Sequence, residues 1–158
     1  MLYNIFDSPV GELTVSTDGT YITALHIEGD RYFTSIPKDW VFAPAHPLLQ
    51  QAGRELKEYF TGTRTAFDVP LKPSGTPFQS QVWNALQAIT PGTTETYGSI
   101  ALSLGKPMGA ARAVGTAIGR NPICIMIPCH RVLASNGKLG GFVAGLKCKQ
   151  QLLAVERN

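Results

Sequence analysis

A thiol, an imidazole and a guanidinium stand next to one another at Cys129, His130 and Arg131. A free cysteine is only a few per cent ionised, roughly, at neutral pH, so a nucleophilic thiol needs a base or a positive charge close by. The neighbours of Cys129 can supply both. The trio therefore indicates nucleophilic chemistry at Cys129, although a buried structural cysteine followed by a loop histidine has the same local sequence.

The residues before this thiol form an apolar run from Ile123 to Ile127, between Pro122 and Pro128. β-Branched residues between prolines are typical of a short, buried, extended segment. We therefore expect Cys129 to be held by a rigid, buried part of the chain.

The motif from Pro128 to Val132 resembles the active-site signature of the O6-alkylguanine-DNA alkyltransferases, the methylated-DNA–protein-cysteine methyltransferases. The resemblance extends to residues 78–83, 97–98, 110–115 and 121–122, and to a last helix that ends at Glu156. Related proteins that bind alkylated bases without repairing them have tryptophan in place of the cysteine. The presence of Cys129 therefore predicts a competent alkyl acceptor.

The resemblance implies DNA repair by direct reversal: an alkyl group, such as methyl, moves from O6-alkylguanine in DNA to Cys129. Whether O4-alkylthymine is also a substrate stays open. Glu156 would orient His130, which would activate the thiol through a water molecule, and Tyr97 would donate a hydrogen bond to the leaving base. A thioether has no easy leaving group, so each molecule would react once, with neither cofactor nor metal. Without the resemblance, Glu156 is equally a surface carboxylate and Tyr97 a half-buried aromatic.

For the DNA and the flipped base, the resemblance implies residues from several segments. Arg112 would take the place of the extruded nucleotide, and Asn121 would brace the cysteine segment. Phe142 stands where the family usually has tyrosine, which leaves the pocket width open. The full expected set is Ala110, Ala111, Arg112, Gly115, Asn121, Arg131, Val132, Phe142 and Val143.

Residues 110–118 are predicted to form a helix with almost no side-chain bulk apart from Arg112, after a short helix at 99–104 and a turn at 105–109. This spacing is typical of a helix-turn-helix. Small residues equally suit close packing against another helix. In the resembled family, this helix enters the minor groove of double-stranded DNA, which is roughly 6 Å wide, and a flipped base leaves a gap that a planar cation can fill.

The formal net charge is only +3, but the charges are unevenly distributed. Residues 1–95 contain six basic and ten acidic side chains, whereas residues 96–155 contain seven basic side chains and no acidic one. A purely cationic segment of this length suits a polyanionic surface such as DNA.

The overall pattern predicts an α+β fold with two domains, at residues 1–75 and 76–158. Strands expected at 3–6, 13–16 and 21–27 would form an antiparallel sheet, covered by one helix between His46 and Gly62. Residues 28–46 are expected to be irregular. The second domain is expected to be mainly helical, with helices at 78–89 and 146–155 besides the helix-turn-helix, and with Trp83 in a packing role.

The three cysteines have neither the spacing of a metal-binding motif nor that of a disulfide framework. Some members of the resembled family bind zinc near the N-terminus, partly through cysteines, but here the first cysteine is Cys124. No apolar run approaches the roughly 18 residues of a membrane span. We expect a cytoplasmic monomer that does not bind membranes.

Two other functions are compatible with parts of the sequence. A non-enzymatic protein that binds alkylated DNA or acts as a regulator would also have a helix-turn-helix and a basic segment. A cysteine hydrolase would need turnover and an oxyanion hole. Cys129 argues against the first alternative, and the stoichiometry of transfer would exclude the second.

Overall fold

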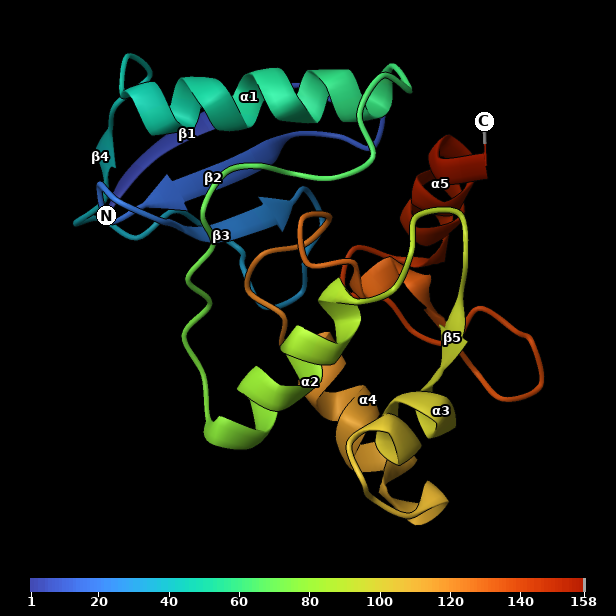
Figure 1. Ribbon diagram of the computed structural model, residues 1–158. Coiled ribbons are helices and arrows are strands. Elements are labelled where there is room, and N and C mark those ends of the chain that lie inside the picture. Colours follow the sequence, from blue (N-terminus) through green and yellow to red (C-terminus); the bar gives the residue numbers. More distant parts are fainter. Residues whose placement is uncertain (158) are drawn as a thin grey trace.

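The computed structural model describes residues 1–157 and confirms the α+β fold (Figure 1). Its N-terminal half contains a four-stranded sheet in the order β3-β2-β1-β4, built from β1 (Leu2–Phe6), β2 (Leu13–Thr17), β3 (Ile22–Ile27) and β4 (Val41–Phe42). The first three strands pair antiparallel, as expected, but β4 pairs parallel with β1 and makes the sheet mixed. Both residues of β4 are exposed, so no burial pattern marks this strand within the stretch expected to be irregular.

Helix α1 (Pro47–Phe60) covers one face of this sheet (Figure 1). It begins where Nδ1 of His46 accepts a hydrogen bond from the backbone N–H of Leu48, which satisfies one of the free donors of the first turn. Its apolar side is buried against the strands. Gly53 allows α1 to lie close to Phe6 of β1, because a Cβ atom at this position would lie 2.3 Å from the ring of Phe6.

The C-terminal half is mainly helical, as expected. Its helices are α2 (Pro77–Gln87), α3 (Tyr97–Ser103), α4 (Ala111–Gly119) and α5 (Leu146–Arg157), with 3-10 turns η1 (Met108–Ala110) and η2 (Cys129–Arg131). Strands β5 (Glu95–Thr96) and β6 (Val132–Leu133) form a short parallel pair. Capping boxes at Thr76 and Thr96 start α2 and α3. Among residues 1–157, no helix is long and apolar enough to cross a membrane.

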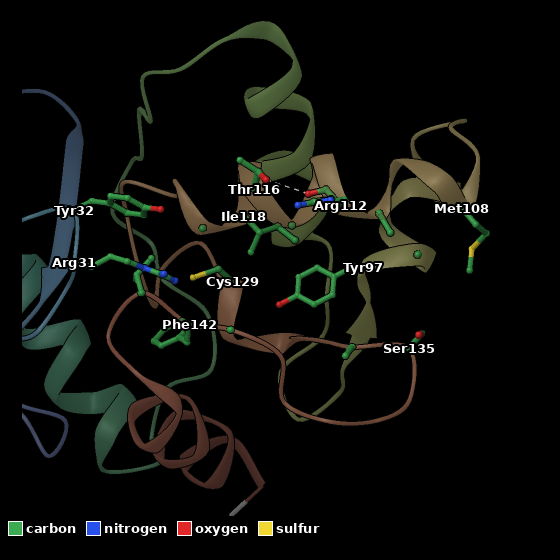
Figure 2. A pocket seen from close by; sticks show the side chains of 17 residues that line it. Arg31, Tyr32, Tyr97, Met108, Arg112, Thr116, Ile118, Cys129, Ser135 and Phe142 are labelled. Atoms are coloured by element: carbon green, nitrogen blue, oxygen red, sulfur yellow. Dashed lines mark hydrogen bonds between the residues drawn. The ribbon is translucent and has the colours of Figure 1, made fainter.

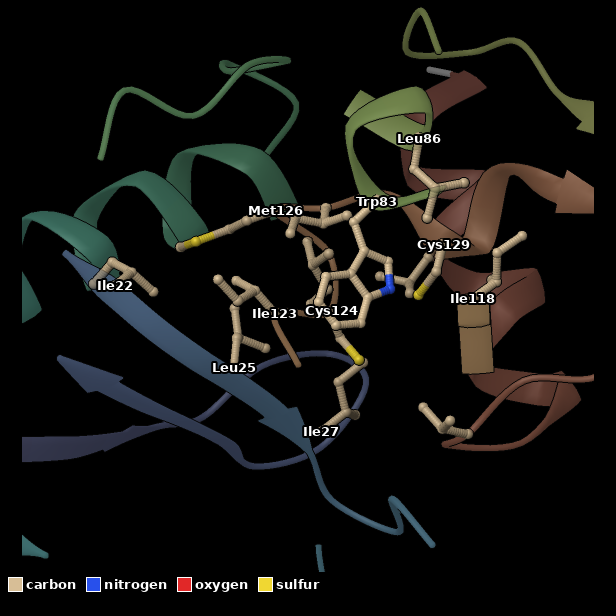
Figure 3. Close-up of a cluster of buried hydrophobic side chains, with 14 of the residues drawn as sticks. Ile22, Leu25, Ile27, Trp83, Leu86, Ile118, Ile123, Cys124, Met126 and Cys129 are labelled. Carbon is tan, nitrogen blue, oxygen red and sulfur yellow. The ribbon is translucent and has the colours of Figure 1, made fainter. Parts of the chain in front are cut away.

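The apolar segment before Cys129 joins the two halves. The backbone N–H of Leu25 in β3 donates to the carbonyl of Pro122 (2.9 Å), and the N–H of Cys124 donates to the carbonyl of Leu25 (3.1 Å). The segment is buried, as expected, but its extended pairing is short, because Ile125 has a φ of 72°. Cys129 then begins the tight turn η2. One apolar core therefore runs from the sheet to the segment that carries the thiol (Figure 3).

Trp83 of α2 lies in this core, between Leu86 and the cysteine segment (Figure 3). It is 1 % exposed, and its indole N–H donates to the carbonyl of Ala117 in α4 at 2.9 Å. The packing role expected for Trp83 is therefore confirmed, and its hydrogen bond sets how α2 lies against α4.

Trp83→Phe should lower the free energy of unfolding by about 2–3 kcal/mol, because it leaves a cavity and removes the buried hydrogen bond from the indole to the carbonyl of Ala117. Chemical denaturation monitored by circular dichroism measures the loss. Trp40→Phe is the matched control, since Trp40 is only half-buried and contacts the rings of Tyr3 and Phe33 at the far side of the sheet. Equal losses in the two variants would contradict the role given to Trp83.

Candidate active site

A pocket of about 650 Å³ lies between the helix-turn-helix and a turn of the N-terminal half, and the side chain of Cys129 faces it (Figure 2). Of the residues expected at the base or the DNA, six others line this pocket: Tyr97, Ala111, Arg112, Gly115, Phe142 and Val143. They come from α3, α4 and the loop before α5, so three segments that are distant in the sequence meet around the thiol. The volume lies within the range of small-molecule sites.

Other expected residues lie away from the pocket. Arg131, expected at the DNA, is only 5 % exposed: its Nε and Nη2 donate to Glu156, and its Nη1 donates to the carbonyl of Ile89 at 2.8 Å. Its guanidinium is turned inward because it pairs with the Glu156 carboxylate inside the protein. Val132 is fully buried in β6, and Ala110 precedes α4 outside the pocket lining.

Asn121 is buried behind the nucleophile rather than in the pocket. Its Nδ2 donates to the carbonyl of Ile127 at 2.8 Å, and its Oδ1 accepts from the N–H of Ile123 at 3.0 Å. These two bonds close the turn between Asn121 and Cys129. The amide therefore braces the cysteine segment, as the sequence predicts.

The Cys129 thiol is 3 % exposed, and its pKa is lowered from the ordinary value. The largest cause is the neighbouring thiol of Cys124; burial opposes it, and Asn121 and the positive charge of Lys149 add to the lowering. The pKa of Cys124 is raised, so this thiol keeps its proton, and its Sγ donates to the carbonyl of Asn121 at 3.9 Å. Local hydrogen bonds thus favour the thiolate at Cys129 over that at its neighbour.

Behind the thiol, His130 and Glu156 form a buried pair, with Nε2 and Oε2 2.6 Å apart. Burial alone would raise the pKa of Glu156, but hydrogen bonds from His130 and Arg131 outweigh it and lower that pKa well below its usual range. Burial lowers the pKa of His130, against the opposing effect of Glu156. The pair at neutral pH is therefore a carboxylate and a neutral imidazole.

These protonation states decide which tautomer His130 adopts. A carboxylate only accepts hydrogen bonds, so Nε2 must carry the proton and Nδ1 must carry the free lone pair. Among residues 1–157, Nδ1 of His130 is the one buried side-chain nitrogen or oxygen without a hydrogen-bond partner. Among these same described residues, no direct hydrogen bond joins His130 to the Cys129 thiol. A base is thus present and oriented, but it does not touch the nucleophile.

Tyr97 lies across the pocket from Arg31 and Tyr32 (Figure 2). Burial, followed by the charge of Cys129, raises the pKa of its phenol, so the hydroxyl remains a donor at neutral pH. The ring approaches the loop at Gly140, where a Cβ atom would lie 2.8 Å from the hydroxyl and φ is 70°. Only glycine fits this approach without strain.

Two family models together match almost the whole chain. The ribonuclease-like domain of 6-O-methylguanine DNA methyltransferase matches residues 1–73, and the DNA binding domain of the same proteins matches residues 77–158. The chain belongs to the 6-O-methylguanine DNA methyltransferase family.

Individual relatives agree with this family over nearly their full length. The methylated-DNA–protein-cysteine methyltransferase of Methanosarcina acetivorans is 44% identical over 99% of this chain and 98% of its own. The crystal structure of Mycobacterium tuberculosis OGT in complex with DNA has a TM-score of 0.92 and 43% identity, and covers 99% of this chain and 93% of that one. The structure of an O6-methylguanine DNA methyltransferase from Methanococcus jannaschii has a TM-score of 0.71 and 30% identity, and the match covers 98% of this chain and 93% of that one.

In this family member, sequence analysis missed the wall of the pocket that comes from the N-terminal half. Arg31 and Tyr32 line the pocket, and the N–H of Arg31 donates to the carbonyl of Val143 at 3.3 Å. The guanidinium of Arg120, after α4, stacks on the ring of Tyr32 at 3.9 Å. These residues stand in a stretch without periodicity, so only the fold reveals their place beside Cys129.

Lys149 of α5 is a second missed residue. It is fully buried, and its Nζ donates to the carbonyls of Val132 (2.6 Å), Gly141 (3.2 Å) and Leu139. Burial lowers the pKa of Lys149 to about 8, and the charge of Cys129 opposes this shift. The protein therefore holds the pocket loop with a buried cation that also favours the thiolate.

Lys149→Met should raise the pKa of the Cys129 thiol, because it removes a buried positive charge beside it. The rate at which iodoacetamide labels Cys129, measured against pH by peptide mass spectrometry, reports this pKa. Lys147→Met is the matched control, since Lys147 is exposed on the same helix. Identical profiles for the two variants would show that Lys149 has no electrostatic role.

Proposed function

We propose that this protein repairs DNA by moving an alkyl group from O6 of guanine in double-stranded DNA to Sγ of its own Cys129. The observation that carries this proposal is the position of Cys129, which faces a pocket bordered by a helix-turn-helix and has a buried imidazole–carboxylate pair behind it. A thiol that faces a pocket of this size can reach a base only after the base has left the duplex.

The transfer begins with loss of the thiol proton. A water molecule held at Nδ1 of His130 takes the proton from Cys129 and passes it to the imidazole, whose positive charge Glu156 then stabilises. Support for this route comes from the free lone pair at Nδ1 and the lowered pKa of the thiol. The thiolate attacks the alkyl carbon, the carbon–sulfur bond forms, and the bond from carbon to O6 breaks.

The electron pair of the broken bond stays with the guanine, which needs a proton or a hydrogen bond as it leaves. Tyr97 is the donor we propose, because its hydroxyl is on the pocket wall and its raised pKa keeps it protonated. Phe142 and Val143 form the opposite apolar wall against which the base lies. O4-alkylthymine has the same reactive bond, and we propose it as a second substrate.

Helix α4 is the part that we propose to enter the minor groove. Ala111 and Gly115 present little bulk at the pocket, and Arg112 extends from the exposed side of the same helix. Its guanidinium can occupy the place left by the flipped nucleotide, where it replaces lost stacking. Of the seven basic residues between 96 and 155, two are internal and Arg112 has this role, so the other four remain to contact phosphates.

The product is a thioether, so the protein acts once and needs no cofactor. We further propose that residues 1–75 and 76–158 form the two domains, that the protein acts as a monomer, and that it is cytoplasmic. Support for the last point comes from its three cysteines, all of which are free thiols.

Incubation with duplex DNA containing O6-methylguanine should add one methyl group per protein molecule, on the peptide that contains Cys129. Intact-mass and peptide mass spectrometry measure the stoichiometry and the site. Cys129→Ser should abolish transfer and leave DNA binding unchanged, because α4 is intact. Methylation at Cys124 or Cys148, or continued turnover, would refute the proposed function.

Arg112→Ala should slow repair of duplex DNA far more than reaction with free O6-benzylguanine, which needs no base flipping. Because unstacking a base costs a few kcal/mol, the difference could reach on the order of a hundredfold in single-turnover rate. Lys138→Ala removes an exposed charge from the same half outside the pocket, and it should slow both reactions little. Equal losses on both substrates for Arg112→Ala would exclude a role in flipping.

A further inference from the structure

Tyr59, at the end of α1, contacts the proposed active site from behind. Its hydroxyl donates to Oε2 of Glu156 at 2.7 Å, across 97 positions of sequence. The same oxygen accepts from Nε2 of His130 at 2.6 Å and from Nη2 of Arg131 at 2.9 Å. The N-terminal half thus supplies a hydrogen-bond donor to the carboxylate that holds the imidazole.

The position of this hydroxyl is set by packing. The Tyr59 ring is 2 % exposed, and the rings of Phe60 and Phe67 lie 5.1 and 5.5 Å from it, centroid to centroid. Burial, followed by the charge of Glu156, raises the pKa of Tyr59 far above its ordinary value. The phenol therefore stays protonated, and it can only donate to Glu156.

We propose that Tyr59 is a positioning residue of the alkyl-transfer site: its hydroxyl shares Oε2 of Glu156 with His130 and thereby limits how strongly the carboxylate holds the imidazole. This inference rests on the proposed function. It gives the N-terminal half, which contains neither the nucleophile nor its base, a direct part in the proton transfer.

The expected direction follows from competition for one oxygen. A carboxylate oxygen that accepts several hydrogen bonds has its charge partly neutralised, so it stabilises a neighbouring imidazolium less. Loss of the Tyr59 hydroxyl leaves more negative charge for His130. The hydrogen bond between Nε2 and Oε2 then strengthens, and His130 holds a proton to higher pH.

Other charged groups face this pair. Arg131 contacts Glu156 directly, and the positive charges of Arg131 and Lys149 both lower the pKa of His130. Arg64 lines a small pocket with Tyr59 and Glu156, but Glu58 and Asp68 pair with its guanidinium at 2.9 and 3.1 Å. Lys149 is charged below its pKa of about 8.

Two thiols are also close. Cys148 is one of the groups whose charge would raise the pKa of Tyr59. Burial raises the pKa of Cys148 itself to about 11, so this thiol stays neutral. Cys129 loses its proton through His130, so the acid side of a rate profile reports the two groups together. Below about pH 8, this thiol–imidazole pair is what changes charge beside Glu156.

Tyr59→Phe tests the proposal, because it removes the hydroxyl and keeps the ring. In the proton NMR spectrum, the Hε2 resonance of His130 should move further downfield than in the parent protein. In single-turnover reaction with free O6-benzylguanine, the acid limb of the rate profile should move up by about 0.5 pH unit, and the rate below the limb should fall about threefold. The rate at alkaline pH should be unchanged.

Phe67→Leu is the matched control, since it loosens the packing of the Tyr59 ring and leaves its hydroxyl in place. It should lower the melting temperature without moving the Hε2 resonance or the acid limb. An unmoved resonance in Tyr59→Phe, or an equal displacement in Phe67→Leu, would overturn the role of the hydroxyl. Absence of transfer in the parent protein would refute the proposed function instead, and the NMR comparison would still decide the contact.

Discussion

Backbone pairing at the edge of β3 is the constraint on which the site depends. The outer edge of this strand hydrogen-bonds to the chain on both sides of Leu71 and, further along, to the segment around Ile123. An open strand edge invites pairing with other chains, and here it is covered by the segment that leads to the nucleophile. The position of Cys129 relative to the sheet is therefore set by main-chain bonds, which side-chain substitutions alter little.

A buried ionic cluster lies behind this pairing. Removing Glu156 from water is costly, and the structure offsets the cost with hydrogen bonds from Tyr59, His130 and Arg131. Lys149 is likewise buried and donates only to carbonyl groups. The basic residues of the C-terminal half thus fall into two groups. Most are on the surface, whereas Arg131 and Lys149 are buried and stabilise the site and its loop from within.

The sequence predicted the parts that local patterns determine. Short segments separated by turn residues located β1 to β3, helical periodicity located α1, and the motif around Cys129 indicated the chemistry. β4 was missed because its side chains are exposed and its pairing depends on β1 alone.

The remaining site residues depend on tertiary contacts that no local pattern records. Arg31 and Tyr32 become pocket residues only when the turn after β3 meets Val143. Arg131 lies inside because Glu156, 25 positions later, is inside. The sequence around Arg131 is the same whether its side chain faces solvent or an internal carboxylate. Its role could therefore be predicted only after Glu156 had been placed inside the protein.

The long span between Tyr59 and Glu156 has a consequence for the order of folding. Contacts between distant residues require closure of a large loop, and chains rich in them fold slowly. The sheet and α1 rest mainly on local pairings, whereas the imidazole–carboxylate pair forms only after α5 has docked against both α1 and η2. The contact that orients the imidazole is therefore expected to form late in folding, although His130 is next to Cys129 in the sequence.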